Sequence, residues 1–266
     1  MNKLGRAIHN IHAADAGRQG RAGAVHPLAR LLVALWYAVA VVSFGRYDIA
    51  GLSGMLPYLL IFGIWDGISV KDMAGRIFPV LVLTGIAGAA NPFLDREVYW
   101  RIGQNGVTGG MISMATLMLK GIFCAASSYL LMWEIGMEGI CYSLRCLHVP
   151  KEFVTALLLI YRYLIVLLKE AERMMQAYKL RAPGQRGIHI KAWGAFVGQL
   201  LLRSIDRAET VYESMLLRGY HGEFAGKYFR WEKGISISYV LLWGMAIACF
   251  RAVPVFELTG NLLQRI

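Results

Sequence analysis

The sequence predicts an all-α integral membrane protein with about five transmembrane helices and a pair of long cytoplasmic helices. Hydrophobic residues make up 57% of the 266 residues, whereas soluble domains contain roughly 45–50% apolar residues. The mean hydropathy is +0.48. The apolar residues gather in long runs, which favours membrane spans over one large soluble core.

Five apolar runs are candidates for the spans, although the first three fall short of the roughly 20 residues that cross a bilayer. The runs cover residues 28–44, 49–65, 76–90, 107–133 and 235–253. The predicted organisation is a cytoplasmic N-terminal tail, four transmembrane helices, a cytoplasmic helical region, and a last transmembrane helix with the C-terminus. In the same order, these segments are 1–27, 28–134, 135–233 and 234–266.

The distribution of basic residues orients the spans. The region 134–234 contains fifteen Lys and Arg, and the N-terminal tail contains several more, whereas the loop 91–106 contains two. Cytoplasmic segments carry an excess of Lys and Arg. We therefore expect the tail and the long region on the cytoplasmic side of the cell membrane, and the C-terminus outside.

Two long amphipathic helices are predicted in the cytoplasmic region. Pro150 is placed at the first position of one helix, as is common for proline, and Pro183-Gly184 ends it. The second helix covers about 190–218. Each helix has an apolar stripe, which is typical of helices that lie at a membrane surface or pack beneath the spans. The stripes are Leu164, Leu168, Ala171, Met175 and Tyr178, and Leu201, Ile205, Ala208, Tyr212 and Met215.

The two helices end in a short repeat. "AERMMQAYKLR" (171–181) aligns with "AETVYESMLLR" (208–218) at an offset of 37 residues. One interpretation is ordinary helix termination, because a cation near a helix C-terminus contributes about 0.3–1 kcal/mol and glycine suits the left-handed closing residue. The other is docking, because a guanidinium fits an acidic or carbonyl-lined groove on a partner. The endings are Leu180-Arg181-Ala182 and Leu217-Arg218-Gly219.

These residues carry a resemblance to a known family. The segments "VPKEFVTALLLIYRYLIVLLKEAERMMQAYKLR" and "SIDRAETVYESMLLRGYHG", with "HPLARLL" before the first run and "NPF" after the third, resemble the transmembrane T component of energy-coupling factor (ECF) transporters. The cobalt/nickel-type branch is the most similar. The two endings resemble the family's arginine-centred coupling motifs, and Ala182 departs from the glycine that many members have there.

The resemblance implies a function in transport. A T component links two cytoplasmic ABC-type ATPase subunits to a separate membrane substrate-binding S component, and the arginine motifs dock on the ATPases. The transported substrate, which could be cobalt, nickel or a vitamin, is left open. The sequence agrees by lacking a G-x-x-x-x-G-K-[ST] phosphate loop, so another chain would hydrolyse ATP. We expect no catalytic residues, no cofactor and, for want of a recognisable binding motif, no nucleic-acid partner.

Two other classes are weighed against this interpretation. An integral membrane enzyme acting on lipid would need clustered acids and a nucleophile with a base, but Asp66, Asp72, Asp95 and Glu97 are scattered. A stand-alone membrane transporter would need polar, broken spans at midplane, and only Lys120 fits that description. An intramembrane lysine costs about 2.5–3.5 kcal/mol and usually marks function. Lys120 therefore has either a packed, functional or interface role, or a place near a water-filled cleft.

Metal and thiol chemistry is not expected. The N-terminal histidines have spacings that could gather ligands, but neighbouring glycines give no rigid frame. The four cysteines match neither a zinc set nor a redox pair, so we predict free, buried thiols. The candidate ligands are His9, His12, Asp15 and His26, and the cysteines are Cys124, Cys141, Cys146 and Cys249.

The charge distribution generates a topology prediction. In a variant without the native cysteines, a cysteine placed at Gln104 should react with a membrane-impermeant thiol reagent on intact cells, and a cysteine at Gly184 should not. The reverse labelling pattern would contradict the orientation and the cytoplasmic position of the two long helices.

Overall fold

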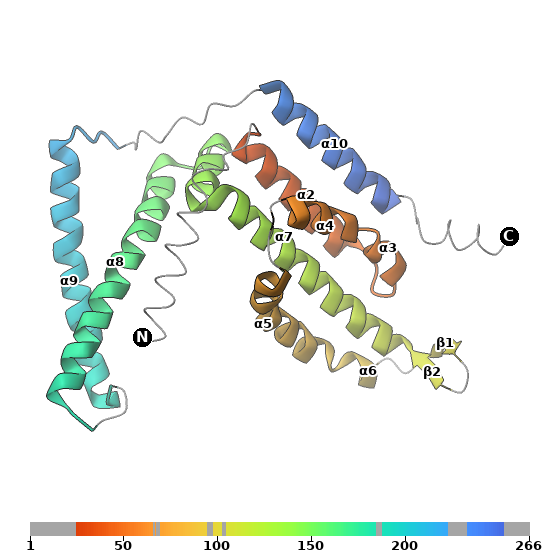
Figure 1. Ribbon diagram of the computed structural model, residues 1–266, viewed down its shortest axis with the longest axis horizontal. Coiled ribbons are helices and arrows are strands. Elements are labelled where there is room, and N and C mark those ends of the chain that lie inside the picture. Colours follow the sequence, from red (N-terminus) through yellow and green to blue (C-terminus); the bar gives the residue numbers. More distant parts are fainter. Residues whose placement is uncertain are drawn as a thin grey trace. The chain divides into compact units, whose positions relative to one another are not determined.

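The computed structural model describes two compact units, both dominated by helices (Figure 1). Of the described residues, the first unit comprises Val25 to Gly136 together with the last helix, and the second runs from Met137 to Gly222. The described residues are 25–65, 67, 70–94, 98–102, 105–184, 188–222 and 233–252.

The first unit has a helix at each of the five predicted spans. Only α7 (Gly109–Cys146) is both long and apolar enough to cross a membrane, among the helices that the structure describes. The prediction of five spans therefore stays a prediction, although the helix positions agree with it. The other helices of this unit are α2 (Pro27–Ser43), α3 (Ile49–Ser53), α4 (Leu56–Trp65), α5 (Val70–Gly88), α6 (Asn91–Leu94) and α10 (Lys233–Ala252).

A short two-stranded hairpin stands between α6 and α7 in the chain, in a structure whose other described elements are helices, as predicted. Strands β1 (Val98–Ile102) and β2 (Asn105–Thr108) pair antiparallel, with Trp100 opposite Val107. The sequence of β1, VYWRI, contains β-branched and aromatic residues, which favour strands. The stretch was predicted to be a loop between two spans, because it is shorter and more polar than the apolar runs on either side.

The core of the first unit is built around aromatic side chains. Tyr37 of α2 is fully buried, stacks on Tyr58 at 4.3 Å between ring centroids, and donates its hydroxyl to the Met55 carbonyl at 3.1 Å. Trp243 of α10 packs edge-on to Tyr58 at 5.3 Å. Aromatic pairs of this kind contribute about 0.5–1.5 kcal/mol each, so this cluster holds α2, α4 and α10 together.

The outward faces of the same helices are apolar. Leu35 on α2, Ile86 on α5 and Met245 on α10 are 62%, 70% and 72% exposed. Exposed apolar surface of this extent marks an interaction with membrane or protein. A helical unit that is apolar inside and outside agrees with a protein surrounded by lipid.

Small residues allow α7 to approach α5 and α6 closely. A Cβ at Gly88 would lie 3.2 Å from Met114 Cγ, and a Cβ at Gly110 would lie 2.3 Å from the Asn91 carbonyl oxygen.

A sharp kink interrupts α7 at Gly136, which has φ 63° and ψ −177°. This backbone region is accessible essentially to glycine alone. The fourth apolar run was predicted to end at residue 133, but the helix resumes after the kink and continues to Cys146. The kink is also the boundary between the two units along the chain.

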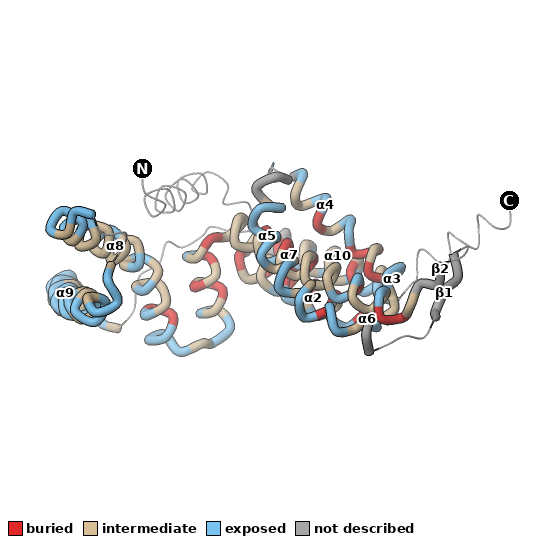
Figure 2. The backbone as a smooth tube through the Cα atoms, turned by 90° about the horizontal axis from the view of Figure 1, so that it is seen from below, coloured by how far each residue is buried: buried red, intermediate tan, exposed pale blue. Residues whose placement is uncertain are grey.

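The second unit contains two long helices with little burial. α8 (Lys151–Arg181) has two buried residues, Val154 and Thr155, and α9 (Ile190–Leu217) has none. Figure 2 shows the exposed colour along most of α9. Both helices lie where the sequence predicts them. Pro150 is the N-cap residue rather than the first helical residue, so that assignment was wrong by one position.

The backbone at Gly136 generates a stability prediction. Gly136→Ala should lower the free energy of unfolding by about 1–3 kcal/mol, because an alanine Cβ is strained at this φ and ψ. Thermal unfolding in detergent would measure the change. Gly63→Ala is the matched control, since Gly63 lies in α4 with open space around its Cβ position. The control should not be destabilised, and equal losses in both variants would contradict the prediction.

Candidate functional site: two exposed helix ends

The first Leu-Arg pair lies at the end of α8. Arg181 is the last helical residue, and Leu180 before it is 83% exposed. Ala182 caps the helix with φ −125° and ψ 65°, and its N–H donates to the Tyr178 carbonyl at 3.0 Å. The chain turns away without a left-handed residue at position 182, because the Cβ of alanine disfavours that conformation.

The second Leu-Arg pair ends α9 in a different way. Gly219 has φ 78°, and its N–H donates to the Leu216 carbonyl at 2.9 Å. The Tyr220 N–H donates to the Met215 carbonyl at 3.0 Å. These two bonds form the Schellman motif, in which a left-handed glycine follows the C-cap residue, here Arg218. The predicted left-handed glycine is confirmed.

The two helix ends differ in backbone geometry, but both expose their leucine and arginine side chains. Leu217 is 90% exposed, like Leu180 at the other end. Both arginines are exposed, and within the part of the chain that the structure describes neither forms an ion pair. Helix termination explains a cation at each end but leaves the two exposed leucines without a role. Each end therefore presents one apolar and one cationic side chain.

The two ends point away from each other because α8 and α9 are antiparallel. The Arg203 guanidinium contacts the Glu170 carboxylate, and the His189 N–H donates to the Tyr178 hydroxyl at 3.4 Å. Figure 1 shows the two helices side by side, with their C-terminal ends at opposite ends of the pair. At 1.5 Å per residue, the 28 residues of α9 separate Arg181 from Arg218 by about 40 Å. The two arginines therefore offer two separate contact points.

Lys120 occupies a defined position in the first unit. Its ammonium group donates to the carbonyls of Val42 and Phe44, at 3.1 and 2.6 Å. Arg251 of α10 donates to the Ser43 carbonyl at 3.2 Å, and its guanidinium lies 4.6 Å from the centre of the Phe44 ring. The last carbonyls of a helix lack partners within the helix, so Lys120 and Arg251 together satisfy the C-terminal end of α2.

Sequence analysis missed a second polar contact in the first unit. Arg30 of α2 lies 3.6 Å from the Glu134 carboxylate of α7, and their side chains are 17% and 9% exposed. Glu134 precedes the kink at Gly136 by two residues, so this pair joins α2 to α7 beside the kink. Arg30 and Glu134 each lie near the end of a predicted span, and that position in the sequence was the available indication that they could pair.

The remaining candidates do not gather into a site. His26 caps α2, with Nδ1 accepting from the Leu28 N–H at 2.9 Å, and burial lowers the pKa of this imidazole and favours its neutral, accepting form. The structure brings together no group of three or more His, Cys, Asp or Glu in the ranges it describes. His9, His12, Asp15, Asp66, Asp95, Glu97 and the Asp72 side chain lie outside those ranges.

The four cysteines are free, as predicted. Cys141 is buried, but Cys249 is exposed, and Cys124 and Cys146 are half-buried. The prediction of general burial was therefore wrong for Cys249, because apolar neighbours in sequence do not reveal which face of a helix is covered.

These features define the class of protein: an apolar helical chain, with one of its described helices able to cross a membrane, that carries a basic helical pair with exposed ends. A family model described as CbiQ, cobalt transport protein, matches residues 23–228. The chain belongs to this cobalt transport protein family. The membership confirms the resemblance to the cobalt-type branch and agrees with a membrane location.

Similar proteins include two uncharacterised proteins of Methanocaldococcus jannaschii, which are 28% and 29% identical over 135 and 140 residues. A protein of Methanocorpusculum labreanum named as a fused cobalt transport protein, CbiMQ, is 24% identical over 195 residues. The matches cover 50%, 52% and 65% of this chain, and 46%, 50% and 32% of the three relatives, respectively. The chain thus spans half or less of the length of these curated relatives.

The contacts of Lys120 generate a prediction that separates packing from function. Lys120→Met should lower the free energy of unfolding by about 1.5–3 kcal/mol, because it removes charged donors from two backbone carbonyls. Lys120→Arg should recover most of that loss. Thermal unfolding in detergent would measure both, with uptake measured in parallel at matched amounts of folded protein. Loss of uptake in Lys120→Met without loss of stability would contradict the packing role.

Proposed function

We propose that this chain is the transmembrane coupling subunit, or T component, of an ECF-type ABC importer. It links ATP hydrolysis by two cytoplasmic ATPase subunits to a separate membrane subunit that binds the substrate. The chain itself is not catalytic. The tail and the second unit lie in the cytoplasm, and the helices of the first unit cross the cell membrane several times.

The exposed Leu-Arg ends of α8 and α9 are the observation that carries this proposal. Each end presents a leucine that is more than four-fifths exposed beside an arginine. Such a pair is costly to leave in water and suits a pocket with an apolar wall and an acidic or carbonyl-lined mouth. Two ends about 40 Å apart on an antiparallel pair match two docking grooves, one on each ATPase subunit.

Rigid helices explain how docking would transmit motion. If ATP binding brings the two ATPase subunits together, it moves the two docked ends, and α8 and α9 carry that displacement along their length. The ion pair of Glu170 on α8 with Arg203 on α9 helps the two helices to move together. Glu170 also pairs within α8 with Arg173, at 3.5 Å. These pairs are partly exposed and individually contribute little.

The family description supports cobalt as the cargo, and one relative supports a second membrane component as a partner. The family is described as a cobalt transport protein, which supports cobalt as the substrate of the assembled transporter. The protein of M. labreanum is named as a fusion, and its similarity to this chain covers 32% of its length. Such a fusion supports the view that this chain works beside a second membrane component.

A double substitution tests the proposal. Arg181→Ala/Arg218→Ala should lose co-purification with the ATPase subunits and lose uptake, while the chain still inserts at normal levels. Removing one partner of a docked charge costs about 2–5 kcal/mol, which is roughly thirtyfold or more in affinity per site. Each single variant should retain one anchor and lose assembly in part. Pull-down and cobalt uptake would be measured on all three.

The matched control is Lys169→Ala/Lys191→Ala, which also removes one exposed cation from each helix. This variant should assemble and transport normally, because neither residue lies at a Leu-Arg end. Full assembly and uptake in the arginine double variant would show that the two arginines only terminate helices.

A further inference from the structure

A groove separates part of α8 from part of α9 within the second unit. Its volume is about 520 Å³, and its walls are almost entirely apolar. Leu159, Tyr163 and Leu167 line it from α8, and Ala208, Val211 and Met215 line it from α9. Ligand pockets in proteins occupy roughly 300–1,000 Å³, so the groove has room for a ligand of substantial size.

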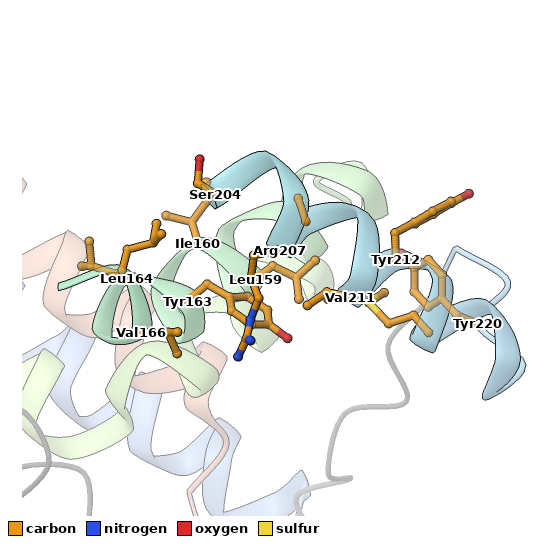
Figure 3. Close-up of a pocket in the computed structure, with 13 residues that line it drawn as sticks. Leu159, Ile160, Tyr163, Leu164, Val166, Ser204, Arg207, Val211, Tyr212 and Tyr220 are labelled. Carbon is orange, nitrogen blue, oxygen red and sulfur yellow. The ribbon is translucent and has the colours of Figure 1, made fainter. Parts of the chain in front are cut away.

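One cation stands on the wall of this groove. Arg207 lines it from α9 and is exposed, and Figure 3 shows its side chain extending toward the α8 side, where Tyr163 lies. Arg203, one turn earlier on α9, contacts Glu170, whereas Arg207 has no ionic partner among the residues with described positions. A guanidinium without a partner beside an apolar surface attracts an anion that is attached to an apolar body.

The surroundings of the groove match a membrane surface. The segment 151–218 contains eleven Lys and Arg against six Asp and Glu. Its apolar stripe on α9 is open, with Leu201 and Tyr212 58% and 56% exposed. Basic amphipathic helices with large apolar residues lie in the plane of the headgroups, where anionic lipids attract them.

We infer that the groove binds one anionic phospholipid, with an acyl chain between α8 and α9 and the phosphate on Arg207. The apolar walls of the groove shield the acyl chain of the lipid from water. The Arg207 guanidinium offers paired donors to the phosphate oxygens. Arg207 is separate from the two Leu-Arg ends, so this lipid site does not depend on the proposed contacts with ATPases.

Native mass spectrometry of the purified chain in detergent tests the inference. The probes are dioleoyl phosphatidylglycerol, which is anionic, and dioleoyl phosphatidylcholine, which has no net charge. The wild-type chain should retain phosphatidylglycerol about fivefold better, because one Lys or Arg near anionic lipid contributes on the order of 1 kcal/mol. Arg207→Gln should remove that preference and leave weak binding of both lipids.

Two further variants separate the parts of the site. Ala208→Trp fills the groove while Arg207 remains, and it should abolish retention of both lipids; helix content is checked by circular dichroism. Arg162→Gln removes an exposed arginine of α8 that does not line the groove, and it should behave as wild type.

Three results would overturn the inference. Equal retention of the two lipids by the wild-type chain would exclude a role for the phosphate. Equal effects of Arg162→Gln and Arg207→Gln would show attraction to net charge rather than to a site. Unchanged lipid retention in Arg207→Gln, with loss of a co-purifying membrane protein, would assign the groove to a protein segment. Co-purification with ATPases should be normal in Arg207→Gln, so failure of this test leaves the coupling proposal standing.

Discussion

The backbone carbonyls at the C-terminal end of α2 set the arrangement of the first unit. These last carbonyls have no partners within the helix, and a buried carbonyl left without a partner is costly. Lys120 of α7 and Arg251 of α10 supply the missing donors, across 76 and 208 residues of sequence from Phe44 and Ser43. A charge that would be costly in lipid is thereby used to join three helices.

The second unit, in contrast to the first, has little internal packing. Its two long helices share a few contacts, and α9 buries no residue at all. Helices of this kind gain most of their stability from packing, so the exposed stripes and the exposed ends indicate surfaces that lipid and partner chains cover. Such open surfaces suit the coupling role that we propose, whereas the first unit has a fixed core around Tyr37.

Local sequence signals predicted the helices and their ends well. The left-handed Gly219 followed from its position after the last periodic residue. The repeat, however, suggested two equal ends. Only the α9 end forms a Schellman motif, because glycine adopts positive φ without strain and Ala182 does not.

Tertiary partners could not be predicted in the same way. Lys120 was recognised as unusual from its place in an apolar run, but its partners are backbone carbonyls, and any helix end could have supplied them. The pairing of Arg30 with Glu134 likewise depends on which helices become neighbours. The family description supports the role in transport, while docking by Arg181 and Arg218 rests on exposure and charge.

Contact between each exposed helix end and one ATPase subunit is most directly tested by photo-crosslinking in the assembled transporter. A benzophenone amino acid would replace Leu180, Leu217 or, as a mid-helix control, the 58% exposed Leu202. Positions 180 and 217 should each give an adduct with the mass of this chain plus one ATPase subunit, and position 202 should give none. Absence of ATPase adducts at both ends, or equal adducts at position 202, would contradict docking through the Leu-Arg ends.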